Sequence, residues 1–303
     1  MMGDSLTVTY GFHHHDGSLF LSLLMEFIKK ERKMISLNEL LNINRTSNER
    51  EPAFKPKESS DLKSYFQGAG LPQFASDLSG IFGTIVFHVP HASNVLPESF
   101  FKDCQAFDKG KRQHLREVSL KMGDLLLLDL IKEMNPEFLI VAAPYSRIYC
   151  DVEKYWDEDK EVMARYGMGA VYRKDCFGHP LHQQTPAFME EAKAYYETWH
   201  NNLYKAVMST FNQDNKSCLL IDLHSYGAEM ADVFGHGPYP DICFGYNKGE
   251  RNPLLMYLVE SYCKAKGLAY KENFPYSGAM TLDKPCPHQV TSLMIEINKR
   301  VYL

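Results

Sequence analysis

From residue 81 onward, short apolar runs alternate with longer stretches of helical periodicity, and this alternation limits the possible fold more than any other feature. The apolar runs have the length of strands, and several are apolar throughout, which is typical of strands buried on both faces. Strands that alternate with helices favour a layered α/β domain. We therefore predict a three-layer α/β fold for residues 81–303, with a central mixed, mostly parallel sheet and helices on both faces.

The same patterns give approximate element boundaries. Strands are predicted at 81–89, 138–142, 218–223, 241–246, 269–272 and 293–298. Helices are predicted at 115–134, 186–212 and 253–266, and Gly267 ends the last of them. In sheets of this kind ligands bind at the carboxyl ends of the strands, so candidate functional residues are sought there.

Residues 1–80 differ in composition from the remainder and are predicted to form a separate, partly flexible N-terminal extension. The stretch 42–60 is rich in Asn, Arg, Glu, Lys and Ser, so it cannot bury much apolar surface. Three adjacent histidines, His13 to His15, favour an exposed turn over a metal site, because a flexible segment does not hold ligands in a fixed geometry.

Composition and charge argue against several classes of protein. The formal net charge of −5 gives no overall attraction to nucleic acid or to anionic membranes. Seven irregularly spaced cysteines without a CxxC pair favour reduced thiols over a disulfide framework. The chain start lacks a signal-peptide pattern, and the early apolar run Leu19–Ile28 is too short to span a membrane. We therefore predict a cytoplasmic protein that binds a small molecule and neither nucleic acid nor membrane.

Three of the predicted strands bring side chains that suit metal catalysis. The first leads into His91, the third continues into His224, and the last contains Glu296. Two imidazoles and a carboxylate from separate strands would converge at one edge of the sheet, and zinc favours ligands of these kinds. A carboxylate beside an activated water can serve as a general base, and a buried glutamate among apolar neighbours is costly without such a purpose.

A further metal ligand is needed, and the predicted helix 115–134 offers two candidates. Asp124 follows Gly123 and precedes four leucines, at the margin of a buried face. Glu117, two turns earlier, is the alternative, and spacing alone explains Asp124 equally well as a solvated helix residue. His88 is more consistent with a buried core histidine than with a residue that supports the metal site.

Seven short motifs, in the same order, resemble those of the N-formylglutamate amidohydrolase family over about residues 82–303. They are 89–93 (VPHAS), 123–124 (GD), 144–147 (PYSR) with Asp151, 196–200 (YETWH), 219–225 (LLIDLHS), 273–278 (NFPYSG) and 296–302 (EINKRVY). The resemblance implies a fold similar to that of zinc-dependent exopeptidases and zinc amidases.

Carried over by motif, the resemblance implies that His91, Asp124 and His224 bind Zn²⁺. It implies that Glu296 is the general base that takes a proton from the attacking water and passes it to the leaving nitrogen. The activity it implies is hydrolysis of the amide bond of an N-acyl, formyl-like amino acid. The expected partner is therefore a small-molecule N-acyl amino acid.

The resemblance also implies substrate-binding residues. Arg147 would hold a substrate carboxylate with its planar guanidinium group. Asn298 and Arg300 would contact the substrate or orient the general base, and His200 would face the substrate from a helix. A structural ion pair is the alternative for both arginines, and a structural role is the alternative for His200.

The chain departs from the family pattern after Asp151. Glu153 stands where the family has asparagine, and Lys154 stands where it has arginine. A carboxylate facing the pocket would repel an anionic substrate, and lysine lacks the bidentate fork of arginine. The substrate is therefore left open between N-formylglutamate, another N-acyl amino acid and a small peptide-like amide.

Two other functions compete with amide hydrolysis of this kind. A binding or regulatory protein could keep the fold without turnover, but the joint presence of His91, Asp124, His224 and Glu296 argues against it. A metallopeptidase for small peptides is the other, although the chain has no HExxH helix. The surroundings of Ser225 lack the GxSxG pattern, which argues against a serine nucleophile.

Overall fold

The fold was analysed in a computed structural model of the chain. It describes residues 82–102, 114–115, 118–119, 122–125, 127–128, 131, 139–176, 178–181, 184–212, 217–227 and 237–301. The predicted N-terminal extension with its boundary near residue 80, the cluster of three histidines and Glu117 lie outside these residues. The domain division therefore stays a prediction.

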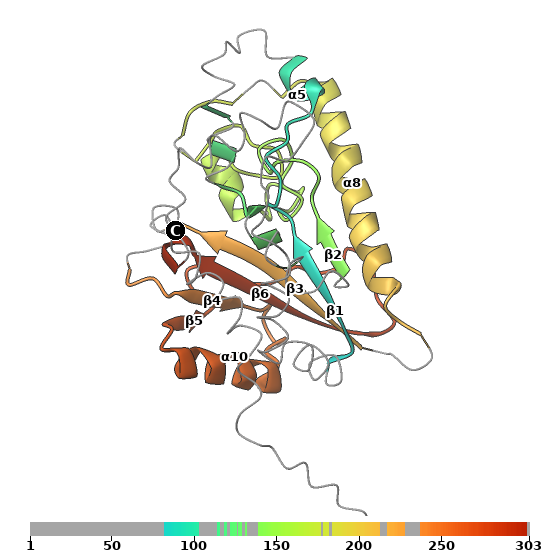
Figure 1. Ribbon diagram of the computed structural model, residues 1–303. Coiled ribbons are helices and arrows are strands. Elements are labelled where there is room, and N and C mark those ends of the chain that lie inside the picture. Colours follow the sequence, from blue (N-terminus) through green and yellow to red (C-terminus); the bar gives the residue numbers. More distant parts are fainter. Residues whose placement is uncertain are drawn as a thin grey trace, which may run out of the picture.

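The described elements follow the predicted order (Figure 1). The strands are β1 (Thr84–Val89), β2 (Leu139–Ala142), β3 (Ser217–Tyr226), β4 (Ile242–Gly245), β5 (Tyr270–Glu272) and β6 (Gln289–Asn298). The α-helices are α5 (Glu98–Lys102), α8 (Pro186–Met208) and α10 (Pro253–Lys266), and the short 3-10 helices are η1 (Val162–Tyr166) and η2 (Lys299–Val301). Every predicted strand overlaps an observed one.

The strands form one six-stranded sheet in the order β2-β1-β3-β6-β4-β5. The first four strands run parallel, whereas β4 pairs antiparallel with β6 and parallel with β5. The predicted mixed, mostly parallel sheet is thus confirmed. The register places His88 beside Asp222 on β1 and β3, and His224 beside Glu296 on β3 and β6.

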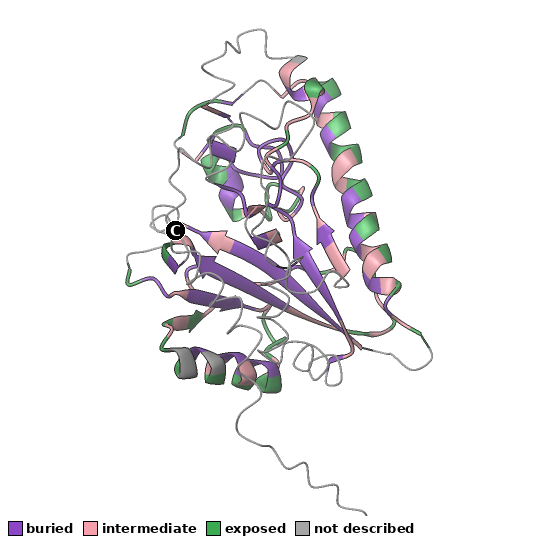
Figure 2. Ribbon diagram, in the orientation of Figure 1, coloured by how far each residue is buried: buried purple, intermediate pink, exposed green. Residues whose placement is uncertain are grey.

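Helices cover both faces of this sheet, which gives the predicted three layers (Figure 1). On one face α8 contributes Trp199, Leu203 and Val207 to a core that includes Val86 and Leu220 of the sheet. The opposite face packs against α10 and the helical residues around 127–131 in a second core. The strands are buried along most of their length, as Figure 2 shows. Successive side chains of a strand alternate between these two cores.

The two long helices have the termini that their sequences predict. Thr185 and Asn252 cap α8 and α10 by accepting hydrogen bonds from backbone N–H groups, and a proline follows each cap. Gly267 ends α10 in the left-handed conformation, with φ of 65°, which glycine adopts without strain. In the part of the chain that the structure describes, no helix is long and apolar enough to cross a lipid bilayer.

The predicted helix over 115–134 is not continuous. Residues on either side are helical, but Gly123 and Asp124 are not. The N–H of Asp124 donates to the carbonyl of His91 at 2.8 Å, and the carbonyl of Asp124 accepts from the N–H of Leu127 at 3.0 Å. Asp124 therefore precedes a new helical segment and is tied to the turn after β1, which helical periodicity alone does not reveal.

A region rich in loops lies beyond the carboxyl ends of β1 and β2 (Figure 1). It contains most of residues 143–185 and has its own hydrophobic core, which includes Ile148, Tyr149, Met163 and Tyr172. This second core fixes the loops above the sheet edge, so side chains from the loops and from the strand ends can face the same space.

Candidate active site and metal centre

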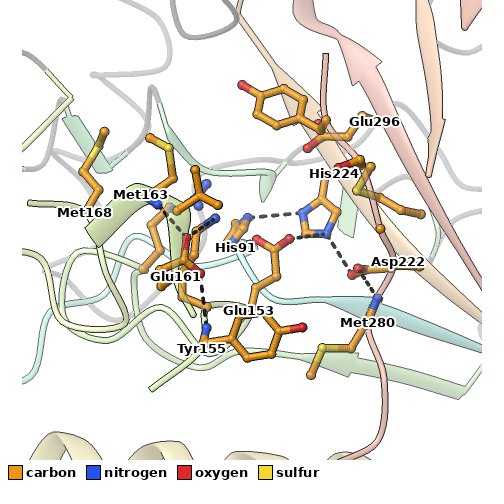
Figure 3. Close-up of a pocket in the computed structure, with 18 of the residues that line it drawn as sticks. His91, Glu153, Tyr155, Glu161, Met163, Met168, Asp222, His224, Met280 and Glu296 are labelled. Carbon is orange, nitrogen blue, oxygen red and sulfur yellow. Dashed lines mark hydrogen bonds and ion pairs between the residues drawn. The ribbon is translucent and has the colours of Figure 1, made fainter. Parts of the chain in front are cut away.

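A cavity of about 460 Å³ lies at the carboxyl ends of β1, β3 and β6 (Figure 3). His91 reaches it from the turn after β1, His224 from β3 and Glu296 from β6. The loop region closes it from the opposite side with Glu153 and Met163. The cavity therefore occupies the place where open α/β sheets bind ligands.

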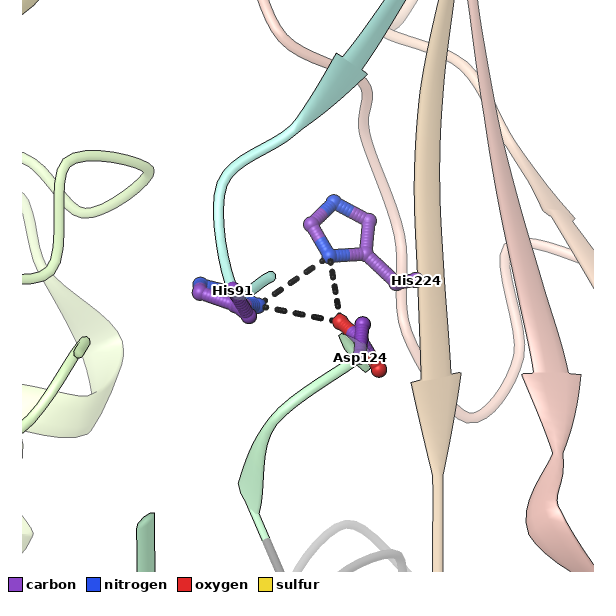
Figure 4. A group of neighbouring side chains, drawn as sticks. All are labelled: His91, Asp124 and His224. Carbon is purple, nitrogen blue, oxygen red and sulfur yellow. Dashed lines mark hydrogen bonds and ion pairs between the residues drawn. The ribbon is translucent and has the colours of Figure 1, made fainter. Parts of the chain in front are cut away.

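His91, Asp124 and His224 form a compact group at the floor of this cavity, which we call the pocket cluster (Figure 4). The Nδ1 atoms of the two histidines are 3.2 Å apart. Asp124 Oδ2 lies 3.5 Å from Nδ1 of His91 and 3.8 Å from Nδ1 of His224. Each side chain is at most 2% exposed, so three potential ligand atoms face one another away from bulk water.

The outer nitrogens of both imidazoles are held by carboxylates. His91 Nε2 lies 2.9 Å from Asp151 Oδ1, and His224 Nε2 lies 2.8 Å from Asp222 Oδ1. An ionised carboxylate only accepts hydrogen bonds, so each Nε2 carries the proton and each Nδ1 keeps its lone pair. This is how carboxylates orient metal-binding histidines, and it leaves both lone pairs directed into the pocket cluster.

The carboxylate of Asp124 completes a site that fits a cation. Its Oδ1 accepts a hydrogen bond from the N–H of Ser225 at 3.0 Å, whereas its buried Oδ2 has no hydrogen-bond partner among the described residues. Burial raises the pKa of Asp124, but His91 and the charge of Lys299 together lower it to about 2. An ionised oxygen and two imidazole lone pairs that face one another in a dry site suit a divalent transition metal.

Glu296 lies next to His224 in the β3–β6 register and lines the cavity. Its Oε2 is buried and has no hydrogen-bond partner among the described residues. Burial raises the pKa of Glu296 from 4.5 to about 7, despite the lowering effect of His224. A carboxyl group with such a pKa can accept and release a proton near neutral pH.

Asp222 is the centre of a supporting network that the sequence did not identify. It accepts hydrogen bonds from Nδ1 of His88 at 2.6 Å, from Nε2 of His224 at 2.8 Å and from the N–H of Met280 at 2.9 Å. Burial opposes its ionisation, but the two histidines hold its pKa far below the ordinary value. His88 is buried, as predicted, and it also supports the site through Asp222. The available signal was the two-residue spacing in β3, which places Asp222 and His224 on one face.

Glu153 faces the pocket cluster, which the sequence analysis had left conditional (Figure 3). Its carboxylate lies 3.4 Å from Nε2 of His91 and 3.7 Å from Nε2 of His224. Burial raises its pKa, but the positive charges of His224 and Lys154 lower it overall. Lys154 also lines the cavity, 3.8 Å from Glu161. The cavity therefore contains an anionic group where the family pattern has a neutral one.

Arg147 lines the cavity but is engaged in a structural ion pair. Its Nη2 and Nε lie 2.7 and 2.9 Å from Asp151 Oδ2, and its Nε also donates to the hydroxyl of Tyr172 at 3.0 Å. The other oxygen of Asp151 holds His91. Arg147 thus positions a metal-site carboxylate, and its contact with a substrate stays a prediction.

The other predicted substrate-binding residues are divided between two places. His200 of α8 lines the cavity, with Nδ1 3.0 Å from Asp283 and with Nε2 buried. Asn298 instead donates to the carbonyl of Pro240, and Arg300 pairs with Asp241 at 3.0 Å. Neither Asn298 nor Arg300 lines the cavity. The structure therefore brings only His200 of these three to the site.

Lys299 is a second functional side chain that the sequence analysis did not identify. Its ammonium group donates to the hydroxyl of Ser225 at 2.7 Å and to the carbonyl of Gly123 at 3.1 Å. It also lies 3.7 Å from Asp124 Oδ1. It thereby balances the charge of Asp124 from outside the pocket cluster. Its place in the EINKRVY motif gave no sign of this role.

Comparisons with known proteins agree with this geometry. A search of curated proteins found no match. The fold resembles the crystal structure of an N-formylglutamate amidohydrolase from Ralstonia eutropha JMP134, with 21% identity and a TM-score of 0.57 over 71% of this chain and 82% of that one. The sequence profile of the N-formylglutamate amidohydrolase family matches residues 83–303. The chain therefore belongs to the N-formylglutamate amidohydrolase family.

Proposed function

We propose that this protein hydrolyses the amide bond of an N-acyl amino acid in the cavity above the pocket cluster, with a zinc ion held by His91, Asp124 and His224. The observation that carries the proposal is the convergence of two Nδ1 lone pairs and one buried carboxylate oxygen beside Glu296. When bound, zinc supplies Lewis-acid activation of a water molecule and of the acyl carbonyl. Two histidines and one carboxylate leave a coordination position open, as in catalytic zinc sites.

The protein's own residues then perform the proton transfers. Glu296 accepts a proton from the attacking water and delivers it to the nitrogen of the departing amino acid. Its pKa of about 7 makes both steps accessible near neutral pH. Asp151 and Asp222 keep the two imidazoles in the tautomer that leaves Nδ1 available. The buried setting excludes water from competing with these hydrogen bonds.

The cavity itself supports a substrate less acidic than N-formylglutamate. The positive groups that line it are paired within the protein, Arg147 with Asp151 and Lys154 with Glu161. Glu153 adds a negative charge close to both histidines. A second substrate carboxylate at this place would meet repulsion. We therefore infer an N-formyl or other N-acyl amino acid whose single carboxylate is bound away from Glu153, with Arg147 and His200 as its candidate ligands.

Two further proposals from the sequence remain. A binding protein without turnover would keep the pocket cluster but would have no use for a general base with a pKa of about 7. A small-peptide metallopeptidase would share the chemistry and differ only in the leaving group. A cytoplasmic location is supported by the free state of the six cysteines in the described part of the chain.

The direct test is hydrolysis of a panel of N-formyl and N-acetyl amino acids and of dipeptides by zinc-loaded protein, with Glu296→Gln as the matched variant. We expect turnover of an N-acyl amino acid by the wild type and loss of about 10²–10⁴-fold in the variant. Glu153→Asn should shift preference toward N-formylglutamate by about tenfold. Wild-type protein that binds zinc but hydrolyses none of these substrates would contradict the proposal.

A further inference from the structure

A second group with the same ligand types lies outside the cavity. His114, Asp175 and His179 bring two imidazole nitrogens and one carboxylate oxygen within 4.8 Å of one another. We call this group the surface cluster. None of its members lines the cavity. The sequence analysis did not single out any of them, because residue 114 is distant in sequence from the other two.

Both imidazoles converge on a single oxygen atom. Asp175 Oδ2 lies 2.8 Å from Nε2 of His114 and 3.1 Å from Nδ1 of His179. The two rings are close, with centroids 5.5 Å apart. The Asp175 side chain is fully buried, whereas His114 and His179 are 41% and 65% exposed. A buried carboxylate thus forms the floor of a shallow site whose two imidazole walls reach solvent.

The backbone around Asp175 holds this arrangement in place. The N–H of Asp175 donates to the carbonyl of His179 at 2.9 Å, and the N–H of His179 donates to Asp175 Oδ1 at 2.9 Å. A β-bridge between Lys174 and Pro180 closes the same loop. Gly178 has a φ of 85°, which suits glycine and allows the tight turn. The loop therefore presents Asp175 and His179 together.

Buried neighbours anchor the surface cluster from both sides. Leu115, next to His114, and Leu181, just after the loop, both belong to the hydrophobic core of the loop region. Leu115 is 1% exposed and Leu181 is 7% exposed. The backbone positions of the two imidazoles are thus fixed relative to each other, and only the side-chain torsions need to adjust to a ligand.

We propose that His114, Asp175 and His179 bind a divalent transition-metal ion, with zinc as the best match, at a second site that clips the 174–180 loop to the segment at residue 114. Imidazole nitrogen and carboxylate oxygen are the ligands that zinc takes, and solvent supplies the remaining positions. On binding, the proton of each imidazole moves to its other ring nitrogen, so that Nε2 of His114 and Nδ1 of His179 bond the ion. Because both rings reach solvent, water can hydrogen-bond the nitrogen that then carries the proton.

Metal content distinguishes the two clusters. Full-length wild type, His224→Ala, His179→Ala and the double variant would be equilibrated with zinc, freed of unbound ion and measured by elemental analysis. We expect one equivalent of zinc per cluster in the wild type, one in each single variant and none in the double variant. His288→Ala is the control, because that half-buried histidine contacts only Phe211 among the ring contacts described and belongs to neither cluster.

The outcome that overturns the surface site is equal zinc content in wild type and His179→Ala. Because His179 is 65% exposed, its replacement should not disturb folding, which circular dichroism would check. Asp175→Asn is the second variant, since it keeps the shape of the side chain while weakening the ligand. If the pocket cluster bound no zinc, the wild type would hold one equivalent and His179→Ala none, so the surface site is tested independently of the proposed function.

Discussion

The pocket cluster and the surface cluster contain the same ligand types but differ in everything around them. In the pocket cluster all three side chains are at most 2% exposed, whereas in the surface cluster the histidines are 41% and 65% exposed. In the pocket, separate carboxylates hold the outer nitrogens and leave Nδ1 available. At the surface, the histidines hydrogen-bond to Asp175, which would itself be a ligand.

This difference shows what preparation a metal site needs. The pocket imidazoles already have the tautomer that binds a cation, whereas the surface imidazoles must exchange theirs. Tighter binding is therefore expected in the pocket. Only the pocket has a neighbouring carboxyl group, Glu296, with a pKa near 7. Identical ligands thus support catalysis in one place and a structural clip in the other.

The largest expected effect separates the two clusters by activity. His224→Ala removes a pocket ligand and should lower kcat/KM by more than about 10⁴-fold, because both the metal and the activated water are lost. His179→Ala should change kcat/KM by less than about threefold. Steady-state hydrolysis of the best N-acyl amino acid measures both. A loss in His179→Ala as great as in His224→Ala would break the division between the clusters.

Glu296→Gln tests whether the general base belongs to the pocket alone. Glutamine keeps the shape but cannot accept a proton, so kcat should fall by about 10²–10⁴-fold while KM changes little. Zinc content should stay at the wild-type value. Loss of zinc together with activity would instead make Glu296 a metal ligand, and unchanged kcat would remove it from the mechanism.

Glu296 also makes the metal-free protein sensitive to pH. Its carboxyl has a pKa of about 7 in the folded protein and an ordinary value of 4.5, so the folded state keeps a proton that the unfolded chain releases between these values. Its contribution is most favourable below pH 4.5 and is lost as pH rises through 7, by up to about 3 kcal/mol.

Urea unfolding of chelator-treated Glu296→Gln and wild type checks this sign. The variant should gain stability relative to the wild type at pH 8 and little at pH 4.5. Asp175, in the surface cluster, pairs with two exposed histidines, so Asp175→Asn should not reproduce this pH-dependent gain. An equal difference between Glu296→Gln and wild type at both pH values would contradict the raised pKa.

The carboxylate behind His224 should have a smaller effect than the ligand itself. Asp222→Asn removes the acceptor that fixes the tautomer, so zinc affinity should fall by about 10–100-fold. Competition with a chromogenic chelator would measure it. The surface cluster in the same variant should bind zinc with unchanged affinity. Unchanged affinity in the pocket would show that the second carboxylate layer contributes nothing to its preparation.

The smallest effect is expected at Arg300, which lies outside both clusters. It pairs with Asp241 on a half-exposed surface and does not line the cavity. Arg300→Ala should therefore change kcat/KM by less than about twofold, since exposed ion pairs contribute little. A loss of 100-fold or more in KM-dependent steps would restore the substrate contact that its motif predicted.

The sheet was largely predictable from the sequence, because apolar runs and capping residues are local signals. The predicted helix that ended at Gly267 was found with the same bounds. The break at Gly123 was not predicted, because its cause is a hydrogen bond between Asp124 and the carbonyl of His91. Contacts of this kind join segments far apart in the chain and leave no periodic trace.

The candidate site was predictable only in part, for the same reason. Strand ends indicated His91, His224 and Glu296, whereas Asp124 depended on the family resemblance. The inward direction of Glu153 follows from packing of the loop region, which sequence alone does not give. The surface cluster went unnoticed because its His114 is 61 residues from Asp175. Side-chain convergence across such separations requires the folded structure.

The most direct measurement is the position of the metal itself. Crystals of zinc-loaded protein, with diffraction recorded on both sides of the zinc absorption edge, would locate each ion by its anomalous signal. We predict a strong peak about 2.0–2.2 Å from Nδ1 of His91, Nδ1 of His224 and Oδ2 of Asp124. A weaker peak is expected at the surface cluster. Full occupancy at the surface with no peak between His91, Asp124 and His224 would contradict a catalytic metal site in the pocket.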